Sequence, residues 1–366
     1  MYETNYSIAR QFHNSGTIVQ IQPYGSGNVN DTYLVEVEGG QRDRFILQRI
    51  NQQVFQRPRL IAANLRVFTE HVQARLDREV HERRWETPAI IQADSGADFV
   101  EARDSEFWRA LTFIDGAETH PTILNSAHAQ EAGYALGRFH TLVSDLDPTQ
   151  LHDTLQGFHI TPQYLAHFDQ ICLQTEIQLT EPSVADGVKF IQRHRHRANL
   201  LEEAKAHGTL VQRAIHGDPK VDNILIDKAS QQAISLIDLD TVKPGLVHYD
   251  VGDCLRSCCN LLGEETDQIE DVRFEIDLCE IILAGYLPVA HSFFSEADYA
   301  YLYESIWLIT FELGLRFFSD YLAGDVYFKA QHPTHNLQRG LVQFKLAESI
   351  ASQEAEIRRV IESVRG

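Results

Sequence analysis

The chain has 366 residues, 43% of them hydrophobic and 23% charged, which is the profile of a globular protein long enough to form two domains. Its 52 acidic and 32 basic side chains give a net charge of −20 at pH 7. A surface this acidic repels nucleic acids and anionic membranes, so we expect neither as a partner. A small anion bound to magnesium is compatible with it, because such a ligand needs only a locally positive pocket.

The cysteines and the N-terminus indicate where the protein resides. There are five cysteines and no CxxC pair, and Cys254, Cys258 and Cys259 fit one face of a helix better than a metal site. We therefore expect reduced thiols and a cytoplasmic location. Residues 1–20 carry no apolar signal core, and the most apolar stretch, residues 281–290, is too short to span a bilayer.

The N-terminal third alternates apolar and polar residues in short runs, a pattern typical of strands. Pro58 opens a helical stretch that extends to about residue 83. Strands and extended segments are expected at residues 18–24, 32–37, 44–50, 89–92, 99–102 and 107–114. Asp115 and Gly116 break the pattern. The sequence therefore predicts a small α+β lobe, residues 1–115, with an antiparallel sheet and one helix.

Residues 116–366 have the longer amphipathic periods of helices and are expected to form a larger, mainly helical lobe. Helices are predicted at residues 127–143, 162–179, 183–205, 251–262, 267–286, 296–322 and 335–364. A short β-rich insert, residues 224–226 and 233–239, interrupts them.

The segment from His216 to Asn223 carries the clearest chemistry, because its polar residues suit phosphoryl transfer. That reaction needs a carboxylate to accept the proton of the attacking hydroxyl, an amide oxygen and a second carboxylate to hold magnesium, and a lysine to neutralise developing charge. In that order, Asp218, Asn223, Asp238 and Lys220 fit these roles. Asp238 ends the second of the two apolar strands that follow the loop, and a hairpin between these strands would return it to the loop.

A structural interpretation of the same residues is that Asp218 and Asn223 shape a turn while Asp238 caps a helix. Either segment alone would be moderate evidence for catalysis. Both segments in this order and at this spacing favour the catalytic interpretation.

The HGDxxxxN loop followed by an Ile-Asp strand end resembles the signature of the aminoglycoside phosphotransferase and choline kinase superfamily, a variant of the protein-kinase arrangement. The resemblance implies a two-lobed protein-kinase-like fold and an enzyme that uses ATP and Mg²⁺. It also implies that the N-terminal lobe binds the nucleotide and that the C-terminal lobe carries out catalysis and binds the acceptor.

Three segments of the small lobe match nucleotide-binding positions of that superfamily. The turn formed by Gly25, Ser26, Gly27 and Asn28 looks like a phosphate-covering loop, although a lone GxG is also an ordinary hairpin turn. Gln48 occupies the third-strand position where kinases keep a lysine, and the adjacent Arg49 points to the other face of the strand. The segment Thr112, Phe113 and Ile114 resembles the hinge that bonds adenine, or else is an ordinary edge-of-lobe strand.

Further motifs resemble the N-acetylhexosamine 1-kinase branch, notably GSGNVNDTYLV, FILQRIN, IDLDTVKPG and RFFSDYLAGDVYFK. This resemblance implies transfer of phosphate to the anomeric hydroxyl of N-acetylglucosamine or N-acetylgalactosamine. It also implies that Arg316 and Tyr327 contact the sugar together with Asp218 and Asp238. Structural alternatives are an Arg316–Asp320 salt bridge one helical turn apart and a half-buried aromatic at Tyr327.

Several other polar residues have structural interpretations, and two other functions are compatible with the same motifs. Asp250 and Asp253 are interpreted first as structural acids at a helix start, His140 as a packing or hydrogen-bonding residue, and the pair His194 and His196 as part of a solvated helix face. One rival function is a kinase of another small hydroxyl acceptor, such as an aminoglycoside, choline or homoserine. A rival of another class is a nucleotide-binding pseudokinase scaffold, suggested only by Gln48.

Overall fold

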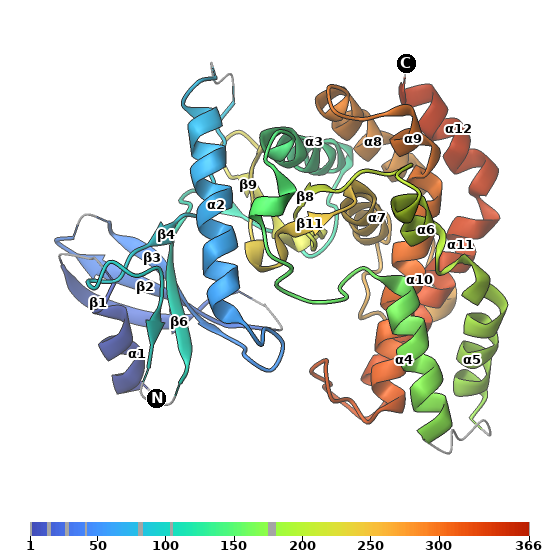
Figure 1. Cartoon of the computed structure of the whole chain (residues 1–366), viewed down its shortest axis with the longest axis horizontal. Coiled ribbons are helices and arrows are strands. Elements are labelled where there is room, and N and C mark those ends of the chain that lie inside the picture. Colours follow the sequence, from blue (N-terminus) through green and yellow to red (C-terminus); the bar gives the residue numbers. More distant parts are fainter. Residues whose placement is uncertain are drawn as a thin grey trace.

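A computed structural model describes residues 2–12, 16–25, 29–40, 42–79, 83–102, 105–174 and 181–365. It has two lobes, one built on an antiparallel sheet and one mainly helical, and helix α2 stands between the sheet and the helical part (Figure 1). The predicted fold class is therefore confirmed. No helix in the described ranges is both long enough and apolar enough to cross a membrane.

The N-terminal lobe is a six-stranded antiparallel sheet in the order β1-β2-β3-β6-β4, with β5 also paired to β6. Alternating residues of the strands point to a buried side, as in Phe45, Leu47 and Ala110, and build a small core. The lobe consists of α1 (Tyr2–Ala9), β1 (Thr17–Pro23), β2 (Asp31–Glu38), β3 (Arg44–Ile50), α2 (Pro58–Leu76), β4 (Ile90–Ile91), β5 (Val100–Glu101) and β6 (Phe107–Thr112).

The C-terminal lobe packs its helices around one large core, with two small sheets at the side that faces the N-terminal lobe. Strand β7 (Ala117–Glu118) pairs with β9 (Ile224–Asp227), which pairs with β10 (Ala233–Leu236), and β8 (Arg213–Ile215) pairs with β11 (Lys243–Gly245). The helices are α3 (Ser126–Val143), α4 (Thr161–Gln174), α5 (Pro182–His194), α6 (Leu200–Ala206), α7 (Val247–Cys258), α8 (Ile276–Ala290), α9 (Glu296–Ala300), α10 (Leu302–Leu322), α11 (His335–Ser352) and α12 (Glu354–Arg365).

Several predicted helices are in fact divided or shifted. The prediction for residues 183–205 covers α5, a 3-10 turn and α6; residues 296–322 cover α9 and α10; and residues 335–364 cover α11 and α12. The helix predicted to reach residue 83 ends at Leu76, α7 starts four residues earlier than expected, α8 starts nine residues later, and α1 was not predicted. The physical reason is that hydrophobic periodicity reports the buried face, which can continue across a break in the backbone hydrogen bonds.

Candidate active site

The β9–β10 hairpin and a contact of the His216 ring bring the predicted catalytic residues together. The β9–β10 pairing places Leu236 opposite Ile224, and the Ile237 N–H donates to the Asn223 carbonyl at 2.9 Å. Asn223 and Asp238 therefore meet, although fifteen positions separate them along the chain. The His216 ring also contacts the Ile237 carbonyl at 3.0 Å, which ties the start of the loop to the same strand end.

The backbone of the loop is held by the buried carboxylate of Asp250, in the first turn of α7. This carboxylate accepts hydrogen bonds from the backbone N–H groups of His216 at 2.7 Å and Gly217 at 2.8 Å. The other neighbour of Asp250 is the His140 ring at 2.9 Å, and His140 also contacts the Tyr286 hydroxyl at 2.9 Å. Burial alone would raise the pKa of Asp250, but the His140 hydrogen bond lowers it, so the carboxylate is charged.

Gly217 is required at the tightest point of the loop. Its φ is 89°, in the left-handed region, and a Cβ there would lie 2.7 Å from the Thr241 carbonyl oxygen. The Thr241 hydroxyl in turn donates to the His216 carbonyl at 2.9 Å. Any larger residue would therefore push the loop away from the segment that carries Asp238.

The side chains of the loop form a compact polar group. The Asn223 Nδ2 donates to the Asp218 backbone carbonyl at 2.8 Å and to its carboxylate at 3.3 Å, which leaves the amide oxygen available. The Lys220 Nζ lies 3.6 Å from the Asp218 Oδ2. Burial raises the pKa of Asp218 to about 7, an effect that Lys220 opposes. The Asp238 side chain is exposed to the cavities. Its pKa is nevertheless raised to about 6, mainly because the surrounding protein desolvates the carboxylate and secondly because the negative charge of Asp240 is close by.

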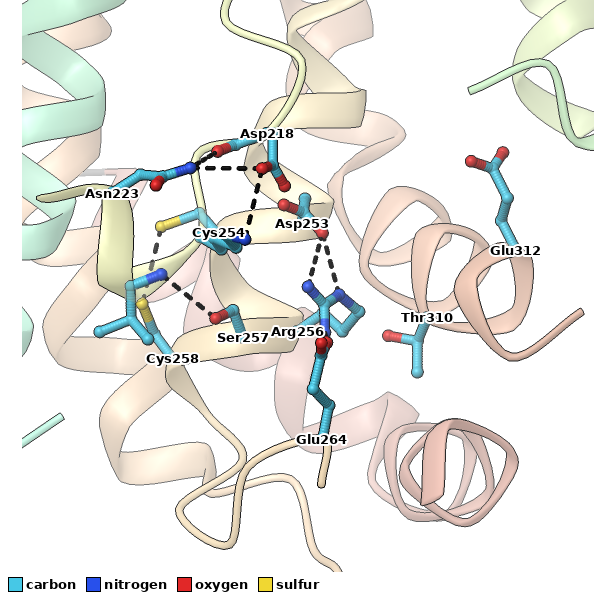
Figure 2. A network of polar contacts seen from close by, with 12 residues as sticks. Asp218, Asn223, Asp253, Cys254, Arg256, Ser257, Cys258, Glu264, Thr310 and Glu312 are labelled. Atoms are coloured by element: carbon cyan, nitrogen blue, oxygen red, sulfur yellow. Dashed lines mark hydrogen bonds and ion pairs between the residues drawn. The ribbon is translucent and has the colours of Figure 1, made fainter. Parts of the chain in front are cut away.

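Figure 2 shows the Asp253 carboxylate between Asp218 and Arg256. The Asp253 Oδ1 accepts from the Arg256 Nε at 2.9 Å, whereas its Oδ2 is buried without a hydrogen-bond partner among the described residues. Glu264 lies 3.4 Å from Arg256 and 2.9 Å from Arg339. Burial alone would raise the pKa of Glu264, but the two arginines lower it. The network holds Asp253 in place on the helical side of the loop.

Two cavities meet at this loop. The first, of about 420 Å³, lies between the β-sheet and the loop of residues 216–223. The second, of about 380 Å³, lies between the loop and α10. Asp218, Lys220 and Asp238 line both cavities. A ligand in one cavity would therefore reach a ligand in the other at the carboxylate of Asp218.

The predicted nucleotide-binding residues line the first cavity where they are described. Gly25, Gln48, Thr112, Phe113 and Ile114 all do so, while Ser26, Gly27 and Asn28 lie outside the described residues. Phe113 and Ile114 follow the last ladder pair of β6, and outside that ladder neither takes part in a backbone hydrogen bond of the described chain. As expected, Arg49 turns to the other face, where it pairs with Asp31 and Glu106.

Arg316 and Tyr327, predicted to contact the acceptor, both line the second cavity. The Arg316 guanidinium lies among aromatic rings, 4.9 Å from the ring centre of Phe158, 5.2 Å from that of Tyr164 and 6.0 Å from that of Tyr327. It forms no hydrogen bond or ion pair with the described residues. Its donors are therefore available to a ligand.

Asp320 does not pair with Arg316, so the salt-bridge alternative is wrong. Its carboxylate instead accepts the backbone N–H groups of Val326 at 3.0 Å, Tyr327 at 2.8 Å and Phe328 at 2.9 Å. Asn336 of α11 also donates to it at 3.2 Å. This clamp fixes the loop after α10 and presents Tyr327 at the mouth of the cavity.

Several residues of the site were not found from the sequence. Arg109 on β6 lines the first cavity and pairs with Asp240. His159 connects the loop of residues 216–223 to α10, because its ring contacts the Gly217 carbonyl at 2.7 Å and the Glu312 carboxylate at 3.0 Å. No local motif marks these residues.

His194, placed on a solvated face by the sequence, packs against Phe190 and Trp307.

The chain belongs to the Phosphotransferase enzyme family, which it matches over residues 20–286. It is a small-molecule kinase of the superfamily that includes the aminoglycoside phosphotransferases and choline kinases, with ATP as phosphoryl donor and an alcohol group as acceptor.

Solved structures share the fold at low sequence identity. A microcompartment-associated aminopropanol kinase is 17% identical with a TM-score of 0.63, covering 98% of this chain and 99% of its own. An aminoglycoside phosphotransferase from Alicyclobacillus acidocaldarius is 16% identical with a TM-score of 0.62, covering 98% and 96%. A choline kinase from Cryptosporidium parvum is 13% identical with a TM-score of 0.61, covering 100% of both chains. At these identities the likeness concerns the fold alone.

Proposed function

We propose that this kinase transfers the γ-phosphoryl group of ATP to the anomeric hydroxyl of an N-acetylhexosamine, N-acetylglucosamine or N-acetylgalactosamine. The observation that carries the proposal is the meeting of two cavities at Asp218, Lys220 and Asp238. Direct in-line transfer requires donor and acceptor to approach from opposite sides of one catalytic group, and two cavities of this size accommodate that arrangement.

ATP occupies the first cavity in this proposal. Its adenine edge would bond the backbone of the Phe113–Ile114 segment, and its phosphates would extend past Gly25 toward Lys220. Since the chain leaves the sheet after Thr112 and joins β9 of the other lobe at Ala117, we place the lobe boundary at residue 115.

Asp218 accepts the proton of the attacking hydroxyl, and Lys220 balances charge on the transferring phosphoryl group. Asn223 and Asp238 would hold Mg²⁺, because they offer an amide oxygen and a carboxylate with no hydrogen-bond donor of its own among the described residues. Two protein oxygens are enough, since Mg²⁺ takes further ligands from water and substrate phosphates. When bound, the ion neutralises phosphate charge, and it would also stabilise the ionised forms of Asp218 and Asp238.

The acceptor occupies the second cavity. Arg316 supplies fixed donors for sugar oxygens or an acetamide carbonyl, and Tyr327 supplies a ring face and a hydroxyl. The Asp253 Oδ2, which has no hydrogen-bond partner among the described residues, would accept a hydrogen bond from a sugar hydroxyl. Carboxylates also line this cavity, but the Arg316 guanidinium has no partner among the described residues and disfavours a cationic group beside it, which supports a sugar over choline or an aminoglycoside.

The test is ADP release with Mg-ATP against N-acetylglucosamine, N-acetylgalactosamine, glucose, galactose, choline and kanamycin. We expect selective turnover of an N-acetylhexosamine. Turnover of choline or kanamycin alone would contradict the sugar assignment and leave a kinase of another acceptor, whereas ATP binding without turnover of any acceptor would favour the scaffold hypothesis.

A further inference from the structure

The nucleotide cavity lacks the third-strand lysine that kinases use for the α- and β-phosphates, because Gln48 occupies that position. The basic residues that line this cavity in the described part of the chain are Arg109 and Lys220. Lys220 lies beside Asp218, where the γ-phosphoryl group is transferred. Arg109 is therefore the available source of positive charge for the rest of the triphosphate.

Arg109 lies directly opposite Gln48 in the β3–β6 ladder. The Gln48 Oε1 accepts from the Arg109 Nε at 3.0 Å and Nη2 at 2.7 Å, so the amide orients the guanidinium. The Nη2 also pairs with Asp240. Only 2% of the Arg109 side chain is exposed, and its Nη1 is buried without a hydrogen-bond partner in the described chain. A buried charged donor without an acceptor is costly, which points to a ligand.

We infer that Arg109 binds the phosphates of the nucleotide and replaces the missing lysine from the adjacent strand. The inference rests on the proposed ATP site. Gln48 and Asp240 are then positioning residues. Asp240 belongs to the segment that carries Asp238, and it also accepts from the Asn30 side chain at 2.6 Å. The carboxylate partner of the phosphate-binding cation thus comes from the C-terminal lobe rather than from helix α2.

A purely structural alternative is that the Arg109–Asp240 pair only joins the two lobes. The two roles predict different ligand dependence. Phosphate binding affects ATP and ADP but not adenosine, whereas a general disturbance of the cavity affects all three ligands. Binding affinity for the three ligands, measured by calorimetry on the full chain, therefore separates the roles.

For Arg109→Gln we expect ATP and ADP affinity to fall by about tenfold to a hundredfold, because a hydrogen bond to a charged group is lost, while adenosine affinity stays unchanged. The control is Arg49→Gln, one position from Gln48 on β3 but facing away from the cavity; it should bind all three ligands like the wild type. Since Arg109→Gln leaves the buried Asp240 charge without its cationic partner, the double variant Arg109→Gln/Asp240→Asn removes both charges and should give the same result in a folded protein.

Two results would overturn the inference: wild-type ATP affinity in both Arg109 variants, or equal loss of affinity for ATP and adenosine. A wild-type protein that binds none of the three ligands would instead contradict the proposed function itself. Adding Gln48→Lys to Arg109→Gln returns an amine to the usual third-strand position, and we expect it to restore part of the lost ATP affinity but to leave adenosine binding unchanged.

Discussion

At the residue scale, Asp218 is the side chain on which both cavities converge, and its removal gives the sharpest prediction. Asp218→Asn keeps the size of the side chain and the contact with Asn223 but cannot take a proton. We expect turnover to fall by about a hundredfold to ten-thousandfold, the usual contribution of a general base, with ATP affinity retained. Steady-state ADP release and ATP calorimetry measure the two effects. A variant that kept most of its rate would show that Asp218 is not the base.

The Asp320 clamp gives a second residue-scale prediction. Asp320→Asn weakens three hydrogen bonds to the backbone of residues 326–328 and loosens the loop that carries Tyr327. We expect the KM for the acceptor to rise by about tenfold, with the KM for ATP unchanged. Asp186→Asn is the matched control, because Asp186 is an exposed carboxylate of α5 whose partner among the described residues is Lys189. An equal rise in both KM values would mean that the clamp does not act on the acceptor site.

At the element scale, α3 and α8 cross at two glycines, and this contact supports the active site through His140 of α3. A Cβ at Gly133 would lie 2.0 Å from the Ile282 carbonyl oxygen, and one at Gly285 would lie 2.3 Å from the Gln130 carbonyl oxygen. These distances leave no room for a methyl group, so the helices pack with their backbones in close approach.

In the variant Gly133→Ala, helix packing and helix propensity change the free energy of unfolding in opposite directions. Helix propensity alone would stabilise the variant by about 1 kcal/mol, whereas the collision should destabilise it by about 1–3 kcal/mol. Chemical denaturation monitored by circular dichroism measures the free energy of unfolding. An unchanged or increased value would show that the two helices can separate without cost.

The elements themselves were largely predictable from the sequence, and their ends were not. The first three strands were expected within about one residue of where β1, β2 and β3 lie, because turn residues separate them and their apolar and polar residues largely alternate. The break between α9 and α10 at Tyr301 leaves no such mark, since the apolar positions continue across it. The extra helix α1 is amphipathic only weakly, so its pattern could not be separated from that of a polar terminus.

At the scale of the whole molecule, buried histidines couple stability to pH. Burial lowers the pKa of His248 from 6.5 to about 4. Its Nε2 contacts the Asp298 carbonyl at 2.9 Å, and its buried Nδ1 has no partner among the described residues. Because the folded-state pKa lies below the unfolded one, the unfolded chain binds the proton more tightly, and this histidine destabilises the fold as pH falls from 6.5 to 4.

His248→Gln tests this coupling, because glutamine can donate to the Asp298 carbonyl without titrating. At pH 8 we expect the variant to be no more stable than the wild type. Between pH 6.5 and pH 5 the free energy of unfolding of the wild type should fall by about 2 kcal/mol relative to that of the variant, because each pH unit contributes about 1.4 kcal/mol. Comparison with the variant cancels the opposite effect of Asp218 and Asp238, whose pKa values are raised. A constant difference in melting temperature between pH 8 and pH 5 would contradict this account.

The active site was predictable to the extent that its residues are close in sequence. Asp218, Lys220 and Asn223 form one motif, and the hairpin that returns Asp238 was recognisable from its two apolar strands. The contact between Arg109 and Asp240 spans 131 positions, and that between His159 and Glu312 spans 153. Such pairs depend on strand register and helix packing, which periodicity does not encode. The sequence indicated the missing lysine but not Arg109, the residue that we infer replaces it.

The most direct test of the central hypothesis is ³¹P NMR of the product formed by the wild-type protein from Mg-ATP and N-acetylglucosamine, repeated with N-acetylgalactosamine. The hypothesis predicts a sugar phosphate whose phosphorus couples to the anomeric proton, with one ADP formed for each phosphate transferred. A phosphate on any other sugar carbon, or no phosphorylated product from either sugar, would contradict it.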